Sequence, residues 1–384
     1  MFSFAGGAGH AMPMMPIART LAARWHKVLF TCQPAMIDTV RGLGFDALDS
    51  GGPTLAAAPV RRPLAKPDRI AEVRVIRESF AGRTARDRAP RIVAVGEAFE
   101  PDVVVRDEVD FGTALAAERL GVPHASVVVL AAGGLITPGL LDAPLSAVCA
   151  DLGLPPNPEL VNRFLTLAPV MPSFRDPTAP LPASSLAIRP DILDDHQRLH
   201  DPAVERLAEW LAKRPGRPLV YFTLGTIFHQ ESGDLFPRIL TGLEELEANI
   251  VVTVGRELDP AELGARSAQV HVERFIPHRA VLPRAAVAVS HAGSGTVVSA
   301  LACGVPLVLL PLGADQPWNA DRCQALGVGR VLDALLVSPI EAAAAVDEVL
   351  HAPNYRMAAR ALQREAESLP PAEVGADAVE QLVG

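Results

Sequence analysis

One histidine stands where acid–base chemistry could take place. His10 ends the glycine-rich run GGAGH, at the point where a short apolar run gives way to a helical pattern. Glycines at such a turn let backbone N–H groups approach a ligand closely, and an imidazole, whose ordinary pKa is about 6.5, suits a general base at neutral pH. Asp107 follows the apolar run 103–105, so its carboxylate could bond the far nitrogen of the ring and fix the tautomer. The sequence predicts His10 as a base and Asp107 as its partner, with Glu108 and Asp110 as alternatives.

A second segment suits the binding of a diphosphate and a sugar. His291 opens the stretch HAGSGT, between a buried apolar run and a helical pattern that begins at about Ser294. Small residues at this place expose N–H groups at the positive end of the helix dipole, where phosphates bind. Asp315 and Gln316 follow the next apolar run, so they fall on the same edge of the predicted sheet. Adjacent carboxylate and amide groups suit the vicinal hydroxyls of a sugar.

Neither glycine turn matches the dinucleotide-binding fingerprint G-x-G-x-x-G. Its third glycine is replaced by Met12 in the first turn and by Val298 in the second. No acidic residue ends the predicted strand 28–31, where an NAD-binding site would hold a ribose. These departures argue against an oxidoreductase that uses a nicotinamide cofactor.

Purely structural roles are open for the residues of the first site. A histidine at the start of a helix can simply hydrogen-bond the backbone, and acids after a strand can be solvated loop residues. The second segment leaves less room for such an alternative, because a histidine, three small residues and an Asp-Gln pair coincide at one sheet edge.

The elements that must position these residues alternate between apolar strands and helices. In the first half, strands are predicted at 1–4, 28–31, 103–106 and 125–130, and helices at 13–24, 69–99 and 115–120. In the second half, strands are predicted at 219–224, 250–254, 270–274, 287–290 and 307–310, and helices at 236–246, 294–301 and 319–326. Apolar runs without alternation indicate strands buried on both faces. The pattern predicts an α/β fold with two Rossmann-like, doubly wound parallel-sheet domains.

Composition suggests where the two domains meet. Residues 173–218 are rich in proline and contain a dense charged patch at 191–198, followed by a helical pattern at 203–213. The predicted organisation is an N-terminal domain at 1–205, a linker at 206–217, a C-terminal domain at 218–360 and a helical tail at 361–384 that packs back on the N-terminal domain.

Composition also excludes several classes of protein. The chain has 384 residues, of which 49% are hydrophobic and 21% charged, which suits two folded domains and excludes a disordered chain. The net charge is -9 with no run of Lys or Arg, so nucleic acid is not expected as a partner. The four cysteines form no C-x-x-C pair, which indicates reduced thiols rather than a zinc site or a disulfide framework.

No membrane-spanning or secretory segment is expected. The chain has no basic residue before Arg19, unlike the start of a signal peptide. The longest uncharged apolar stretch, 125–141, is interrupted by Gly133, Gly134 and Pro138, which favours a buried strand and loop over a membrane helix. The expectation is a cytoplasmic protein.

Taken together, these segments resemble inverting glycosyltransferases of family 1. The resemblance runs over nearly the whole chain and is most specific at 275–319, where the His-x-Gly-x-Gly-Thr element is followed by Asp315 and Gln316. The chain is similar in particular to actinobacterial enzymes that decorate antibiotics and other natural products. The resemblance implies the GT-B fold, with two domains facing across a cleft, and a hexosyltransferase activity.

The resemblance also implies roles for individual residues. His10 matches the general base that deprotonates the acceptor hydroxyl, and Asp107 matches the region of the acid that orients it. The positions that match donor-binding residues are Thr226, Phe275, Ile276, His291, Gly293, Ser294, Gly295, Thr296, Asp315 and Gln316. Acceptor contacts are expected from Met12 and Pro13, near the base, and from Leu130.

The implied reaction is a single displacement in which the domains close over a nucleotide sugar and an acceptor. No cofactor or metal ion is expected, because the sequence offers no D-x-D pair suited to holding a metal near phosphate. The donor is expected to be a dTDP-deoxysugar, with a UDP-sugar as the alternative. The apolar stretch 127–141 suggests a hydrophobic aglycone such as a polyketide, although those residues could also be core.

Several points stay open at the level of sequence. A nucleotide-sugar epimerase or a non-catalytic auxiliary protein could share the fold, and a homodimer is neither indicated nor excluded. The segment 61–88 carries eight arginines and matches no substrate role. It would lie beside the acceptor site in this family, but a solvated helical face explains it equally well.

Overall fold

The computed structural model describes residues 1–52, 63–192, 201–225, 232–255 and 258–384. Contacts divide the chain into two compact units. The first holds the described residues of 1–56, 70–191 and 368–384, and the second holds those of 57–69 and 192–367.

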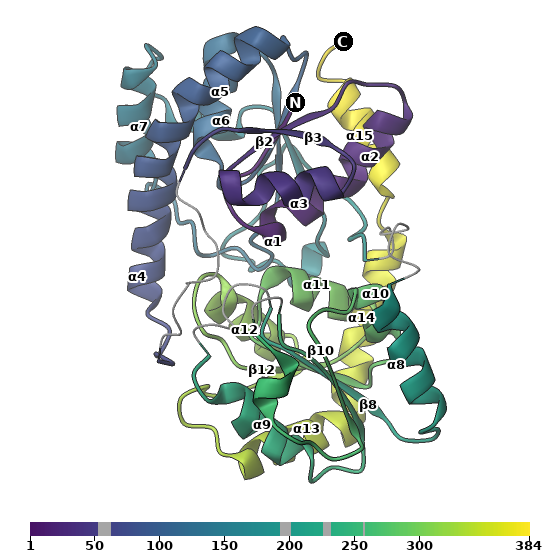
Figure 1. The fold of residues 1–384 in the computed structure, drawn as a ribbon. Coiled ribbons are helices and arrows are strands. Elements are labelled where there is room, and N and C mark those ends of the chain that lie inside the picture. The colour runs from purple at the N-terminus through teal and green to yellow at the C-terminus, as the bar shows by residue number, and fades with distance from the viewer. Residues whose placement is uncertain (53–62, 193–200, 226–231, 256–257) are drawn as a thin grey trace. The chain divides into compact units, whose positions relative to one another are not determined.

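A seven-stranded parallel sheet forms the centre of the first unit, in the order β3-β2-β1-β4-β5-β6-β7 (Figure 1). Its strands are β1 (Phe2–Ser3), β2 (Leu29–Cys32), β3 (Asp46–Asp49), β4 (Val104–Asp107), β5 (His124–Val127), β6 (Leu165–Ala168) and β7 (Ser185–Ala187). The sequence order reverses between the neighbours β1 and β4. In open α/β sheets, ligands bind at such a switch point.

Helices cover both faces of the first sheet (Figure 1). One face carries α2 (Met15–Ala23), α3 (Ile37–Gly42) and α15 (Ala372–Glu380). The other carries α5 (Ala85–Phe99), α6 (Phe111–Leu120) and α7 (Asp142–Asp151). The remaining helical segments of this part are α1 (Ala8–Ala11), η1 (Met12–Met14), η2 (Pro34–Met36), α4 (Arg69–Arg74), η3 (Val75–Thr84), η4 (Pro158–Asn162) and η5 (Pro172–Phe174).

The second unit repeats the architecture with six parallel strands, in the order β10-β9-β8-β11-β12-β13. They are β8 (Leu219–Thr223), β9 (Asn249–Thr253), β10 (Val270–Glu273), β11 (Val287–Ser290), β12 (Leu307–Leu309) and β13 (Gly329–Val331). Its helices are α8 (Pro202–Ala212), α9 (Leu235–Leu243), η8 (Pro260–Leu263), α10 (His278–Val281), η9 (Leu282–Arg284), α11 (Ser294–Ala302), α12 (Gln316–Ala325), α13 (Pro339–His351) and α14 (Pro353–Ser368). Its switch point lies between β8 and β11.

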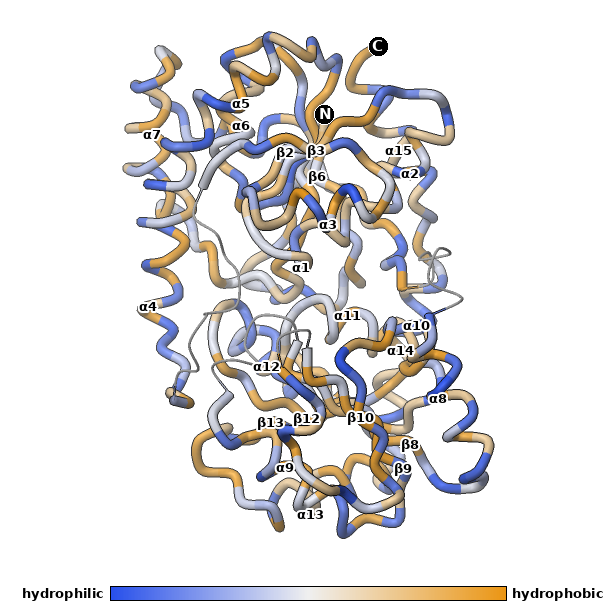
Figure 2. Tube along the Cα trace, viewed as in Figure 1, coloured by the Kyte–Doolittle hydropathy of each residue, from blue (hydrophilic) through white to orange (hydrophobic). Residues whose placement is uncertain are grey.

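The predicted α/β fold class is confirmed, because both sheets are parallel and flanked by helices. Every residue of β2, β8, β9 and β11 is buried, as expected of strands covered on both faces. In Figure 2, hydrophobic and hydrophilic residues alternate along the helical stretch that begins with α4, which is typical of helices with one face on a core.

The unit limits differ from the domain limits predicted from sequence. The predicted linker 206–217 falls partly on α8, whose Leu207 is buried and whose Arg206 pairs with Glu273 of β10 at 2.7 Å. Contacts therefore assign this helix to the second unit. Near the C-terminus, α14 belongs to the second unit and α15 to the first, where it packs on α2. Within the described part of the chain, no helix is long and apolar enough to cross a membrane.

Candidate functional site

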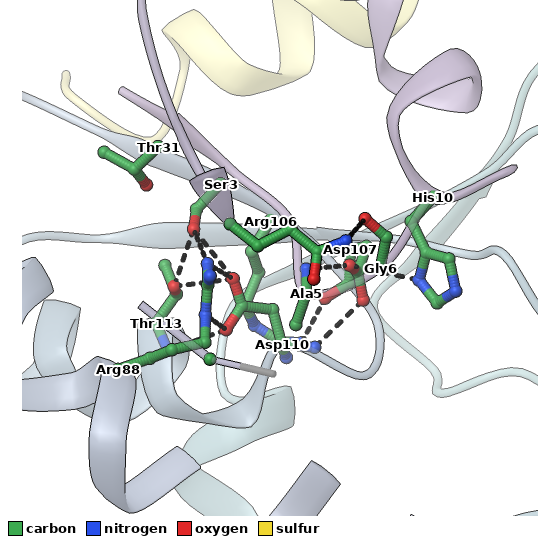
Figure 3. Close-up of polar contacts among 12 residues, drawn as sticks. Ser3, Ala5, Gly6, His10, Thr31, Arg88, Arg106, Asp107, Asp110 and Thr113 are labelled. Atoms are coloured by element: carbon green, nitrogen blue, oxygen red, sulfur yellow. Dashed lines mark hydrogen bonds and ion pairs between the residues drawn. The ribbon is translucent and has the colours of Figure 1, made fainter. Parts of the chain in front are cut away.

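His10 and Asp107 meet at the switch point of the first sheet. β1 leads into α1, which carries His10, and Asp107 is the last residue of β4. Nδ1 of His10 lies 3.3 Å from Oδ2 of Asp107 (Figure 3). Asp107 is fully buried, whereas the His10 side chain is 21% exposed. Figure 3 shows the second ring nitrogen of His10 turned away from Asp107.

Backbone N–H groups fix the carboxylate of Asp107 in place. Oδ2 accepts a hydrogen bond from the N–H of Ala5 at 2.7 Å. Oδ1 accepts from the N–H groups of Val109 at 2.7 Å and Asp110 at 2.9 Å. Since all three are donors, they hold the carboxylate toward His10 and tie the glycine turn after β1 to the end of β4.

The other two acids lie elsewhere. Glu108 accepts from the N–H groups of Val129, at 2.6 Å, and Leu130, and burial raises its pKa. Asp110 caps α6 and pairs with buried Arg88 at 2.8 Å. Burial acts to raise the pKa of Asp110, but the charge of Arg88 and the hydrogen bonds to the carboxylate outweigh it, so the pKa is lowered. Of the three candidate acids, the structure brings only Asp107 to His10.

The residues predicted to contact the acceptor flank this pair. Met12 and Pro13 lie in η1, directly after His10, and Met12 is 41% exposed. Leu130 follows β5 and is half-buried. Its N–H donates to the carboxylate of Glu108, and its carbonyl accepts from Arg175 at 2.7 Å, so two partly buried charged groups fix the backbone there.

In the second unit, His291 lies at the switch point between β8 and β11. Glycines make room for its ring. A Cβ atom added to Gly225, which follows β8 with φ +74°, would fall 2.6 Å from Cε1 of His291, and one added to Gly293 would fall 2.5 Å from Nε2. Both glycines are therefore required for this ring position, and the Gly225 contact was not predicted.

The electrostatics of this site suit an anion. Burial, with a smaller contribution from His278, lowers the pKa of His291 to about 4, so the ring is neutral at pH 7 and can donate one N–H. Helix α11 begins at Ser294 with Gly293 as its N-cap. A glycine has no side chain to cap the first-turn N–H groups of Ser294, Gly295 and Thr296, which therefore face the helix N-terminus as donors.

Asp315 lies beside the start of α11. Its Oδ2 accepts from Oγ of Ser294 at 2.5 Å. Nδ2 of Asn319 donates to the same oxygen at 2.8 Å and to the carbonyl of Ala292 at 2.9 Å. Asn319 is fully buried and joins the two loops of the site. Its role was not predicted, because one polar residue inside a helix gives no signal of burial.

The other residues predicted to bind the sugar donor have different environments. Gln316 is buried, and its Oε1 accepts from the N–H groups of Leu312 at 2.7 Å and Gly313 at 3.2 Å, so it anchors its own loop. Phe275 and Ile276 lie between β10 and α10, and Ile276 is buried. Thr226 lies outside the described residues.

Two alanines in this site adopt left-handed backbone conformations, Ala292 at φ +68° and Ala314 at φ +51°. They stand next to His291 and Asp315, as expected where backbone strain is retained at a functional loop. Ala314→Gly is therefore expected to raise the free energy of unfolding by about 1 kcal/mol. Ala344→Gly, at an exposed position within α13, is the control and should lower it by about 1 kcal/mol. Thermal unfolding measures both, and a loss of stability in Ala314→Gly would contradict the assignment of strain.

The chain is similar to known proteins over most of its length. Residues 237–382 match the family model described as erythromycin biosynthesis protein CIII-like, C-terminal domain. The chain is 30% identical to L-demethylnoviosyl transferase of Streptomyces niveus, covering 84% of this chain and 82% of that protein. It is 29% identical to 4'-demethylrebeccamycin synthase of Lentzea aerocolonigenes, covering 98% and 97%.

Solved structures share the fold. CalG4, the calicheamicin glycosyltransferase, superposes with a TM-score of 0.79 at 23% identity, covering 100% of this chain and 98% of that chain. The spinosyn rhamnosyltransferase SpnG complexed with thymidine diphosphate gives a TM-score of 0.81 at 21% identity, covering 99% of both.

Proposed function

Because the chain belongs to the family of actinobacterial natural-product glycosyltransferases, we propose that it transfers a sugar from a dTDP- or UDP-sugar to a hydroxyl of a hydrophobic aglycone. Family membership makes the protein a glycosyltransferase with the GT-B fold, as the resemblance in sequence predicted. The sugar, the acceptor and the roles of individual residues are the subject of the proposal.

The observation that carries the proposal is the contact between His10 and Asp107. In the proposed step, the second ring nitrogen of His10 takes the proton of the acceptor hydroxyl as that oxygen attacks the anomeric carbon. The carbon–oxygen bond to the diphosphate breaks at the same time, so the configuration inverts. Asp107 holds the ring by Nδ1 at 3.3 Å and stabilises the imidazolium that forms.

The leaving group gains negative charge, and the second unit carries groups that suit it. His291 and the N-terminal N–H groups of α11 are the proposed partners of the diphosphate. One oriented hydrogen-bond donor of this kind stabilises a transition state by roughly 3 kcal/mol. Asp315 and Gln316 are proposed to bind the sugar hydroxyls. Phe275 and Ile276 are proposed to pack on the heterocyclic base of the donor nucleotide. The proposed role of Thr226 near the phosphates rests on sequence alone.

The relatives favour a dTDP-deoxysugar as donor. One transfers L-demethylnoviose, as its name states, and a protein of the same fold is complexed with thymidine diphosphate. The proposed reaction uses no metal ion or cofactor. Met12, Pro13 and Leu130 are proposed to contact the aglycone.

Incubation with dTDP- and UDP-sugars, with and without a panel of hydroxylated aglycones, tests the proposal. The expected result is acceptor-dependent release of the nucleoside diphosphate and a product heavier than the acceptor by one sugar residue. Conversion of the nucleotide sugar without an acceptor would indicate an epimerase. No conversion together with nucleotide binding would indicate an auxiliary protein.

A further inference from the structure

The arginine-rich stretch of the chain forms a wall of a cavity. After α4, the helix continues as η3, a π-helix of ten residues. π-Helical turns are rare and are found mostly as single turns, often at functional sites. Five residues of η3 line one cavity, which contradicts a purely solvated helical face: Val75, Ser79, Phe80, Arg83 and Thr84.

This cavity lies at the sheet edge that also holds His10. Its volume is about 380 Å³, within the range of about 300–1,000 Å³ found for small-molecule sites. Ala5 lines it just after β1, Gln33 just after β2, and Gly51 and Gly52 just after β3. The walls are therefore the carboxyl ends of three strands and the π-helix.

Phe80 connects the cavity to His10. The two rings are nearly parallel, with planes 10° apart and centroids 6.2 Å apart, within the range of about 4.5–7 Å for offset stacking. A Cβ atom on Gly6 would collide with the His10 ring. The ring is thus confined by the backbone of Gly6, by Asp107 and by Phe80.

We infer that Phe80 is a positioning residue for His10 and that, as a wall of the cavity, it receives a flat, unsaturated ring of the acceptor. This inference rests on the proposed function, since it takes His10 to be the base. The widened turns of η3 bring Phe80 and Thr84 to the same wall as Val75 and Ser79. An acceptor ring held against Phe80 then lies at the sheet edge that carries the imidazole, to which its hydroxyl is directed.

The first test measures how accessible His10 is, without any turnover. Diethyl pyrocarbonate modifies imidazoles that solvent can reach, and the His10→Ala variant identifies the signal of His10. Phe80→Leu keeps an apolar side chain but removes the aromatic face, so His10 should react about three- to tenfold faster. Phe80→Tyr should restore the slow rate. Phe99→Leu, the same exchange at a half-buried phenylalanine of α5 that does not line this cavity, is the matched control and should not change the rate.

The second test measures binding of a flat probe, alizarin, to the full-length protein by absorbance titration. Phe80→Leu should weaken binding about three- to tenfold, and Phe80→Tyr and Phe99→Leu should bind like the wild type. Thermal unfolding checks that each variant is folded. Equal reaction rates of His10 in the wild type and Phe80→Leu would overturn the positioning role, and equal affinity for alizarin would overturn the acceptor role. Neither result depends on whether His10 is the base, which the activity of His10→Ala decides separately.

Discussion

His10→Ala is expected to lower kcat by about 10²–10⁴-fold, the usual contribution of a general base. Without the imidazole, nothing accepts the proton of the acceptor hydroxyl while its oxygen attacks. Initial rates of nucleoside diphosphate release, measured with the acceptor that turns over best, give the result. His26→Ala is the matched control. That histidine lies in the same unit, is half-exposed and pairs with Glu380 at 2.7 Å, so its loss should leave kcat unchanged.

The same experiment separates the base from a structural residue. His10→Ala should still unfold in one cooperative transition, because the carboxylate of Asp107 keeps its three backbone N–H donors. Asp107→Asn should also lower kcat, since both carboxylate oxygens accept from backbone N–H groups, and an amide has only one acceptor oxygen and no charge to stabilise the imidazolium. Turnover of His10→Ala at the wild-type rate would remove His10 from the mechanism.

Arg88→Met is expected to lower the free energy of unfolding by about 3–5 kcal/mol, because the substitution leaves Asp110 as a buried charge without its ion-pair partner. The Arg88 guanidinium is fully buried. It donates to Asp110 at 2.8 Å, to Oγ of Ser3 at 2.9 Å and to the carbonyl of Gly51 at 3.0 Å. It thereby joins β1, α5, the start of α6 and the loop after β3.

Thermal and urea unfolding measure this loss, with Arg86→Met as the control. Arg86 lies on the same helix, but its pair with Asp151 is more than half exposed, so its loss should cost less than about 1 kcal/mol. The pKa of Asp110 is lowered in the folded state. Its stabilisation is therefore present above the pKa of the unfolded chain and is lost as the pH falls through the folded value. The difference between wild type and Arg88→Met should shrink in acid, and a variant as stable as the wild type would contradict the argument.

Most strands buried on both faces could be predicted from the sequence, because apolar residues fill most of their positions. The prediction for β11 agrees with the structure at both ends, and the predictions for β8 and β9 differ by one residue. Four strands were missed: β3, β6, β7 and β13. β3 reads Asp-Ala-Leu-Asp and is mostly exposed, and β7 has only three residues. The tail was predicted to be helical, and in the structure Pro370 and Pro371 separate two helices there, α14 and α15.

Some residues of the candidate sites could be predicted from the sequence, and others could not. His10, Asp107 and His291 could be found because each stands at a strand end, and strand ends of a parallel sheet share one edge. Asn319 and Phe80 could not be found. Their importance comes from which distant segments pack against them, and a single sequence carries no trace of that packing.

Calorimetric titration of dTDP into the wild type, His10→Ala and His291→Ala tests the account most directly, because it asks whether the diphosphate site and the base are separate. The account predicts that dTDP binds the wild type and His10→Ala equally, and binds His291→Ala about 10- to 100-fold more weakly, since a hydrogen bond to a charged group contributes about 1.5–3 kcal/mol. Unchanged affinity in His291→Ala, or lost affinity in His10→Ala, would contradict it.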